Sequence, residues 1–137
     1  MSVIVTDNGF QTDDFAGDIL ALDDVTDSAA LAIDLDPDAD PQDLVDRLPV
    51  LHLIRVDFPS FADGRGFTIA RQLRLMGFTG RLRACGHVIS DQYAMARRSG
   101  FDEVEISDDQ ASRQPEAEWT FRANWQSHDY QSRLRAG

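Results

Sequence analysis

The residue types that most clearly suggest chemistry lie in residues 57–74, DFPSFADGRGFTIARQLR. Arg65 stands between Gly64 and Gly66, and Asp63 precedes them. Glycines let the backbone approach a ligand closely, a helix N-terminus offers unpaired N–H groups, and an arginine presents a planar fork of donors. Together these features predict a seat for a small oxyanion such as sulfite, sulfate or phosphate.

The same turn also has a structural interpretation. Asp63 and Arg65 could pair with each other, or with Asp91, and so hold the loop in shape. The motif is neither the phosphate-binding loop that ends in Gly-Lys-Ser/Thr nor a GxGxxG turn. The residues therefore leave two readings open, an anion site and a salt-bridge network.

Two more polar groups follow later apolar runs of the chain. One is Cys85-Gly86-His87 with Asp91 and Gln92, and the other is Ser107-Asp108-Asp109. Because ligands of parallel α/β folds bind at the carboxyl ends of the strands, we expect all three groups to surround one hollow. The candidate acid–base residues are Asp63, His87 and Asp91. The candidate anion-binding residues are Gly64, Arg65, Gly66, Arg71, Arg83 and Gln92.

Single residues within the apolar runs allow further predictions. Arg83 lies in an alternating pattern, so it should point to one face of a sheet, where a buried charge needs a partner. Asp57 or Asp63 is the predicted partner. His52 is predicted to be a hydrogen-bonded core histidine, and Cys85 to be a buried, unreactive thiol.

A metal site could be built from Asp57, Asp63, His87 and Asp91, but their spacing matches no metal motif. We therefore predict no metal. No flavin, nicotinamide or iron–sulfur motif indicates a cofactor, and a single cysteine excludes an internal disulfide.

The elements that would position these residues alternate along the chain. Short aliphatic runs predict strands over residues 30–35, 50–56, 81–85 and 103–106. Between them, helical spacing and Gly-Phe ends predict helices, the first over residues 41–48. This βαβαβαβ order predicts an α/β fold with a mostly parallel sheet and right-handed crossovers, built as an open sheet or a partial barrel.

The two ends of the chain are less regular. Residues 2–5 predict an edge strand, and residues 19–22 a short strand within an otherwise irregular acidic stretch. Residues 107–115 are typical of a polar linker. Residues 116–135 contain two tryptophans and predict a C-terminal helix, which covers one face of the sheet or binds a partner. At 137 residues we expect one α/β domain over 1–137, made of an acidic segment 1–28, a βα core 30–106 and the helix 116–135.

The charge of the chain is unevenly distributed. Residues 1–46 contain thirteen aspartates and no basic residue, whereas residues 47–101 contain nine arginines against three aspartates, and the net charge is −11. Such an acidic chain should repel nucleic acid and anionic membranes, and it could be steered towards a basic protein surface. Without a secretion signal or an apolar run of about 18 residues, we expect a cytoplasmic protein.

Three segments, FPSFADGRGFTIARQLR, GFTGRLRACGHVISDQ and RRSGFDEVEI, resemble the bacterial DUF934 family, a domain of unknown function. The resemblance covers about residues 50–106 and includes the positions of Asp63, Arg65 and Arg83. Where that family commonly has aspartate after the glycine equivalent to Gly86, this chain has His87.

The resemblance implies a small cytoplasmic protein connected with sulfur metabolism, because genes of the family tend to lie beside those of assimilatory sulfite reductase and related enzymes. Some members are labelled as oxidoreductases of sulfite reduction. The first interpretation is an accessory protein that interacts with sulfite reductase or its electron donor and holds a sulfite-like or sulfate-like anion. The second is a small enzyme, an oxidoreductase or acid–base catalyst, that acts on an anionic substrate at the strand ends. The aspartate-rich N-terminal segment favours the first, and the sequence indicates no oligomeric state.

Overall fold

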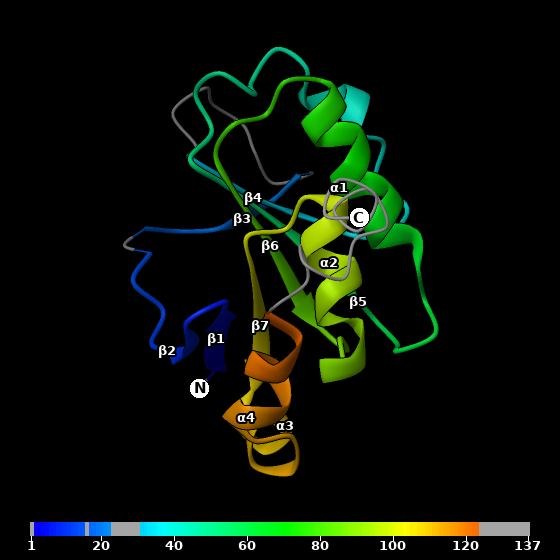
Figure 1. Cartoon of the computed structure of the whole chain (residues 1–137). Coiled ribbons are helices and arrows are strands. Elements are labelled where there is room, and N and C mark those ends of the chain that lie inside the picture. The colour runs from blue at the N-terminus through cyan, green and yellow to red at the C-terminus, as the bar shows by residue number, and fades with distance from the viewer. Residues whose placement is uncertain (1, 16, 23–30, 124–137) are drawn as a thin grey trace, which may run out of the picture.

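The computed structural model of the chain describes residues 2–15, 17–22 and 31–123 (Figure 1). The described residues form one sheet with the strand order β2-β1-β7-β6-β5-β4-β3. Strands β3 to β7 are parallel, and β1 pairs antiparallel with both β7 and β2. The strands are β1 (Ser2–Thr6), β2 (Gly9–Gln11), β3 (Leu20–Ala21), β4 (Ala32–Leu35), β5 (Leu53–Phe58), β6 (Arg81–Gly86) and β7 (Glu103–Ser107).

Helices connect the parallel strands on one side of the sheet. The connections are the 3-10 helix η2 (Pro41–Leu44), helix α1 (Arg65–Leu75), and the 3-10 helix η3 (Ser90–Gln92) followed by helix α2 (Tyr93–Ser99). Because β3 to β7 follow one another in space as they do in sequence, right-handed crossovers place these connections on the same face. Figure 1 shows α1 and α2 together there. The predicted α/β fold with a mostly parallel, open sheet is confirmed.

The helices cover the apolar face of the sheet, which forms the main core. Alternate strand residues point into it, as period-two geometry requires, and are almost completely buried. These strand residues include Ile33, Ile54, Val56, Leu82, Ala84 and Val104. Trp119 is also fully buried in this core, so core packing, the favoured alternative for that tryptophan, is confirmed.

Helices α1 and α2 end in the same way, as predicted. Gly77 and Gly100 adopt left-handed φ angles of 102° and 117°. The N–H groups of Phe78 and Phe101 then donate to carbonyls five residues earlier, each at 3.0 Å. This is the left-handed helix cap that glycine permits, and it directs the chain into the next strand.

Three predictions about local structure are wrong or incomplete. Residues 107–115 are not a linker, because helix α3 (Asp108–Arg113) begins after Ser107, whose hydroxyl accepts the Gln110 N–H. The helix predicted over residues 41–48 is only the short η2. The C-terminal helix begins at Glu116 as α4 (Glu116–Thr120) and continues as the 3-10 helix η4 (Phe121–Ala123), while residues 124–135 lie outside the described residues.

The N-terminal strand is not at an edge, in contrast to the prediction for residues 2–5. Strand β1 lies between β7 and β2, with Val5 opposite Val104. Strand β2, which the sequence analysis missed, forms a hairpin with β1, and its Phe10 N–H donates to the Glu116 carboxylate of α4 at 2.8 Å. The short strand predicted at residues 19–22 is present as β3.

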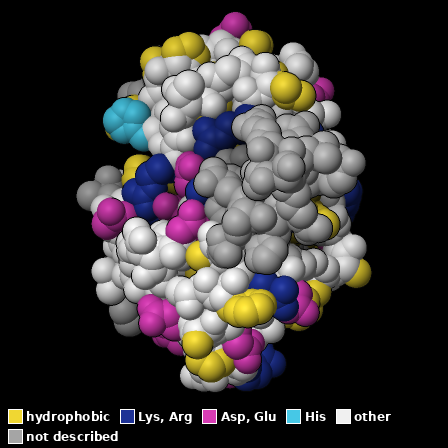
Figure 2. Space-filling model, viewed as in Figure 1, with side chains coloured by type: hydrophobic (Ala, Val, Ile, Leu, Met, Phe, Trp, Pro, Cys, Tyr) yellow, Lys and Arg dark blue, Asp and Glu magenta, His cyan; other side chains and the backbone are white. Residues whose placement is uncertain are grey.

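Among the described residues, no helix has both the length and the apolar character that crossing a bilayer requires. Figure 2 shows acidic and arginine side chains close together on the surface that it views.

Candidate functional site

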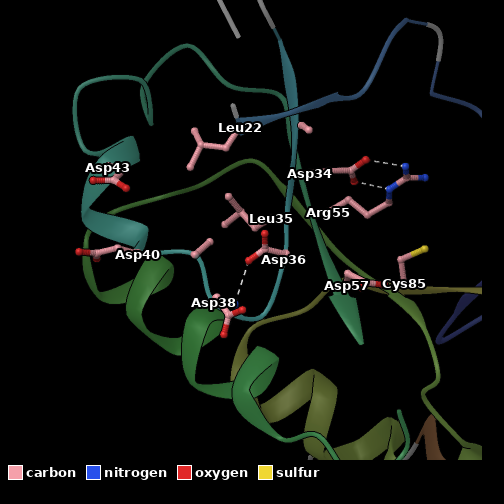
Figure 3. A pocket seen from close by; sticks show the side chains of 12 residues that line it. Leu22, Asp34, Leu35, Asp36, Asp38, Asp40, Asp43, Arg55, Asp57 and Cys85 are labelled. Atoms are coloured by element: carbon pink, nitrogen blue, oxygen red, sulfur yellow. Dashed lines mark hydrogen bonds and ion pairs between the residues drawn. The ribbon is translucent and has the colours of Figure 1, made fainter. Parts of the chain in front are cut away.

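A hollow of about 500 Å³ opens beyond the carboxyl ends of β4 and β5 (Figure 3). Arg55 and Cys85 lie at one side of it. Among the described residues, no group of three or more acidic, histidine or cysteine side chains is arranged to hold a metal ion. The hollow is strongly acidic. Six aspartates line it: Asp34, Asp36, Asp38, Asp40, Asp43 and Asp57.

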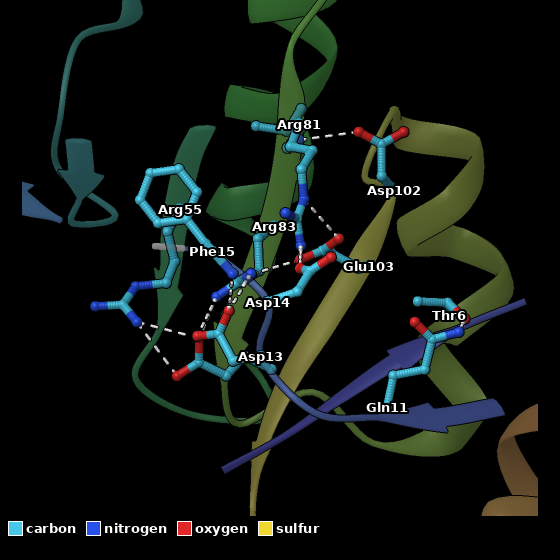
Figure 4. Close-up of polar contacts among 12 residues, drawn as sticks. Thr6, Gln11, Asp13, Asp14, Phe15, Arg55, Arg81, Arg83, Asp102 and Glu103 are labelled. Carbon is cyan, nitrogen blue, oxygen red and sulfur yellow. Dashed lines mark hydrogen bonds and ion pairs between the residues drawn. The ribbon is translucent and has the colours of Figure 1, made fainter. Parts of the chain in front are cut away.

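The sheet face opposite the helices carries side chains of alternating charge, which we call the charge row (Figure 4). It crosses four neighbouring strands, β4 to β7. Every charge in it contacts a neighbour of opposite sign, so the row is balanced at three arginines and three carboxylates. In order of contact its members are Asp34, Arg55, Glu105, Arg83, Glu103 and Arg81.

Arg83 is the centre of the charge row, and its side chain is completely buried. Its Nε donates to Glu103 at 2.6 Å and its Nη1 to Glu105 at 2.9 Å. Glu103 also accepts from Arg81, and Glu105 from Arg55. Burial alone would lower the pKa of Arg83, but hydrogen bonds and charges from its carboxylate partners outweigh burial and raise it.

The strand register explains why these side chains meet. Arg83 lies opposite Arg55 on one side and Glu103 on the other, while Cys85 lies opposite Glu105. Because Cys85 is small, we infer that it leaves room for Arg55 to reach Glu105 from two strands away. Burial raises the pKa of the Cys85 thiol to about 12, and the charge of Glu105 adds to this effect. The thiol is therefore protonated at neutral pH, but Cys85 is only partly buried and borders the hollow, so the prediction of a buried residue is wrong.

Residues 12–15 run over the charge row and add two carboxylates to it. Asp13 meets the buried Arg83 with both oxygens, each at 3.1 Å from a terminal nitrogen. Asp14 lies 2.9 Å from Arg81. The hydrogen bond from Arg83 lowers the pKa of Asp13, so this carboxylate is ionised at neutral pH. Figure 4 shows both aspartates pointing at the arginines.

The DGRG turn forms the start of helix α1. Asp63 accepts hydrogen bonds from the Arg65 backbone N–H at 3.0 Å and from Arg65 Nη2 at 2.7 Å, and this pairing lowers the pKa of Asp63. Arg65 Nη1 contacts Asp38. Gly66 is needed for packing, because a Cβ there would lie 2.4 Å from the Phe58 ring. The predicted pairing of Asp63 with Arg65 is confirmed.

The expected single cluster of Arg65, Arg83, Asp63 and Asp91 does not form. Arg83 is bound within the charge row, so the prediction that Asp57 or Asp63 is its partner is wrong. The physical reason is register, because Glu103 lies directly opposite Arg83 on the neighbouring strand. Asp91 instead pairs with Arg122 at 2.9 Å.

The remaining candidates make separate contacts. His87 is exposed, with Nδ1 3.3 Å from the Phe58 carbonyl oxygen, and Gln92 donates to the Phe61 carbonyl at 2.9 Å. Arg71 lies on the exposed side of α1.

Two further sequence predictions concern residues next to strand ends. The prediction that His52 is a core residue is wrong: strand β5 begins at Leu53, and His52 is exposed in the turn before it. Ser107, Asp108 and Asp109 form the start of α3, where a hydroxyl cap and acidic residues stabilise a helix.

The sequence analysis missed the functional potential of Asp13, Asp34, Arg55, Glu103 and Glu105. A signal for two of them, Glu103 and Glu105, was present, because Arg-x-Arg on β6 and Glu-x-Glu on β7 put opposite charges on the same face of adjacent strands. Asp13 lies in a segment without periodicity, which gives no such signal.

A family model described as "Bacterial protein of unknown function (DUF934)" matches residues 32–136. The match includes the whole charge row and does not reach Asp13 or Asp14. Neither the curated proteins nor the solved structures contain a match to the chain.

Proposed function

The chain belongs to the DUF934 family, and we propose that it is an accessory protein of assimilatory sulfite reduction, which docks through an acidic surface on sulfite reductase or its electron donor. The connection with sulfite reduction rests on the family resemblance given above. The docking mode rests on the charges around the acidic hollow, which is the observation that carries the proposal.

The acidic hollow supports a basic protein partner. Among the described residues that line the hollow, the one arginine is Arg55, which is already bound to Asp34 and Glu105, and Asp38 contacts Arg65. No ion pair with an arginine of the described part of the chain neutralises the remaining lining aspartates, Asp36, Asp40, Asp43 and Asp57. Like charges gathered at one surface raise the local concentration of oppositely charged partners and speed their association.

The rim of the hollow has the mixed character of a protein interface. Asp36, Asp40 and Asp43 are exposed, and the exposed apolar side chain of Val45 directly follows the short helix η2 that contains Asp43. Acidic groups would orient the partner, while apolar contact would contribute to the free energy of binding.

A small oxyanion at the DGRG turn is not part of this proposal. The outer nitrogens of Arg65 already contact Asp63 and Asp38, so an anion would have to displace two carboxylates. A basic partner would instead find these carboxylates at the surface.

Binding to purified sulfite reductase and to its electron donor tests the proposal directly. The triple variant Asp36→Asn, Asp40→Asn, Asp43→Asn removes three charges, and asparagine can still accept the local backbone hydrogen bonds of Asp36 and Asp40. The matched control Asp18→Asn, Asp109→Asn, Glu118→Gln removes three exposed charges elsewhere. We expect isothermal titration at low ionic strength to show binding by the wild type and the control and at least tenfold weaker binding by the triple variant. Equal loss in both variants, or no binding by the wild type, would refute the docking surface.

Growth of a deletion strain tests the pathway. We expect no growth on sulfate or sulfite as sole sulfur source and normal growth on sulfide, because sulfide bypasses the reduction of sulfite. Normal growth on all three would remove the connection with sulfite reduction, whatever the binding experiment shows.

A further inference from the structure

We propose that the charge row is a binding site for the oxyanion group of a small ligand, and that Asp13 and Asp14 occupy this site from within the chain. The ligand class is a molecule with one carboxylate, sulfite or sulfate group. This inference does not depend on the docking proposal, because it concerns the sheet face beneath residues 12–15.

The geometry at Arg83 is that of oxyanion recognition. Both terminal nitrogens meet the two oxygens of Asp13, each at 3.1 Å, which is the side-by-side arrangement that guanidinium groups form with carboxylates and sulfate-like anions. Glu103 and Glu105 hold Nε and Nη1 from the other side. The fork is therefore positioned by the strands, and Asp13 fills the side that remains.

The charges of the strand residues balance without Asp13 and Asp14. The strands alone contribute three arginines and three carboxylates, which balance. Asp13 and Asp14 exceed that balance by two negative charges, so the row keeps a complete set of partners without them. An external oxyanion that replaced Asp13 would restore the present charge at Arg83.

The occupant is peripheral, whereas the site is buried. The Asp13 and Asp14 side chains are 35% and 78% exposed, against 0% for Arg83 and 7% for Glu103. Residues 12–14 are exposed and belong to no helix or strand. Asp14 is largely exposed and Asp13 partly so, whereas the partners of Arg83 on the strands are buried, so displacing this segment costs less free energy than opening the charge row.

The acidic hollow adjoins the charge row. Asp34 and Arg55 belong to both the hollow and the charge row, and Arg55 lies opposite Arg83 on the neighbouring strand. The aspartates of the hollow repel anions, and polyanions most strongly, so we expect a small ligand with a single anionic group that reaches Arg83 from the side where the exposed residues 12–14 lie.

Sulfate, sulfite and acetate are suitable probes, each compared with chloride at constant ionic strength. We expect the double variant Asp13→Asn, Asp14→Asn to bind sulfate at least tenfold more tightly than the wild type by isothermal titration. The Arg83 Nε–H resonance should shift as sulfate is added, which reports the site itself. Asp18→Asn, a change at an exposed aspartate of the same N-terminal stretch, serves as the control and should behave as the wild type.

The single variant Asp13→Asn covers the case in which the double variant does not fold. Equal sulfate affinity in wild type and variants, or binding that leaves the Arg83 resonance unmoved, would overturn the proposal. Failure of both variants to fold, with or without sulfate, would also overturn it, because the two aspartates would then be structural. A preference for acetate over sulfate would assign the site to carboxylates, and the reverse would assign it to sulfur oxyanions.

Discussion

The two faces of the sheet are built from alternate residues of the same strands, yet they are held together by different forces. Leu82 faces the helices among apolar side chains, while the adjacent Arg83 faces the charge row. Hydrophobic burial is non-directional, so the helix face depends on volume and close packing. A buried charge requires particular partners, so the charge row depends on strand register.

The difference between the two faces indicates which face of the sheet is available for a functional site. The apolar face is closed by α1 and α2 and serves stability. Among the described residues, it is the segment 12–15 that runs over the charged face, which lies beside an acidic hollow. The two proposed sites meet at Asp34 and Arg55, which belong to both the hollow and the charge row.

The largest effect is expected on the charged face. Arg83→Met leaves Glu103, Glu105 and Asp13 without their shared partner, and we expect the free energy of unfolding to fall by about 4 kcal/mol. Urea unfolding at pH 7 measures this change. Adding Glu103→Gln to Arg83→Met should recover part of the loss. A loss below about 1 kcal/mol would show that the row contributes little to stability.

Leu82→Ala tests the neighbouring position on the apolar face. A cavity in a fully buried site should lower the free energy of unfolding by about 3 kcal/mol. Repeating the urea experiment in 1 M salt distinguishes the two faces, because the loss at Leu82 should be the same at both salt concentrations. If the loss of unfolding free energy caused by Leu82→Ala depended strongly on salt, the conclusion that hydrophobic burial rather than charge stabilises this face would be contradicted.

The two glycines of the DGRG turn provide a matched pair. Gly66→Ala should cost about 2 kcal/mol, because the added methyl group would lie 2.4 Å from the Phe58 ring. Gly64→Ala should change stability by less than about 0.5 kcal/mol, since the nearest atom to its Cβ is 4.0 Å away. Thermal unfolding measures both. Equal destabilisation by the two substitutions would contradict the packing role assigned to Gly66.

A small effect is also expected for Asp13→Asn. Because Asp13 is partly exposed, we expect a loss of about 0.5 kcal/mol at pH 7. The hydrogen bond from Arg83 lowers the pKa of Asp13 below its ordinary value of 3.8, so the contribution of Asp13 to stability is complete above that pH and is lost as the pH falls through the lowered value. The melting temperatures of wild type and variant should therefore converge in acid. A difference that grows on acidification would contradict the pairing.

The parallel core could be predicted because its signals are local. The runs around Leu82 and Val104 predict strands, and Gly77 and Gly100 lie within two residues of the helix ends that they mark. The hairpin strand β2 and helix α3 were missed because their sequences are short and polar. Their stability comes from pairing with β1 and from the Ser107 cap.

The candidate site was harder to predict than the fold. The position of Arg83 in a strand predicts that it needs a carboxylate partner. Which carboxylate it meets depends on strand register, and no local sequence pattern determines register. Asp13 lies 70 residues before Arg83 and carries no periodic signal. The glycines on both sides of Arg65 led to the prediction of an anion site, although packing against the Phe58 ring alone explains Gly66.

The pairing of β1 with β7 has a consequence for the newly made chain. Val5 pairs opposite Val104, so the first strand leaves the ribosome well before its partner exists. At about 5–20 residues per second, this interval lasts roughly 5–20 s. During that time the aspartates of the N-terminal stretch keep it hydrated and mutually repelling, which should protect an unpaired strand from aggregation until the rest of the sheet is complete.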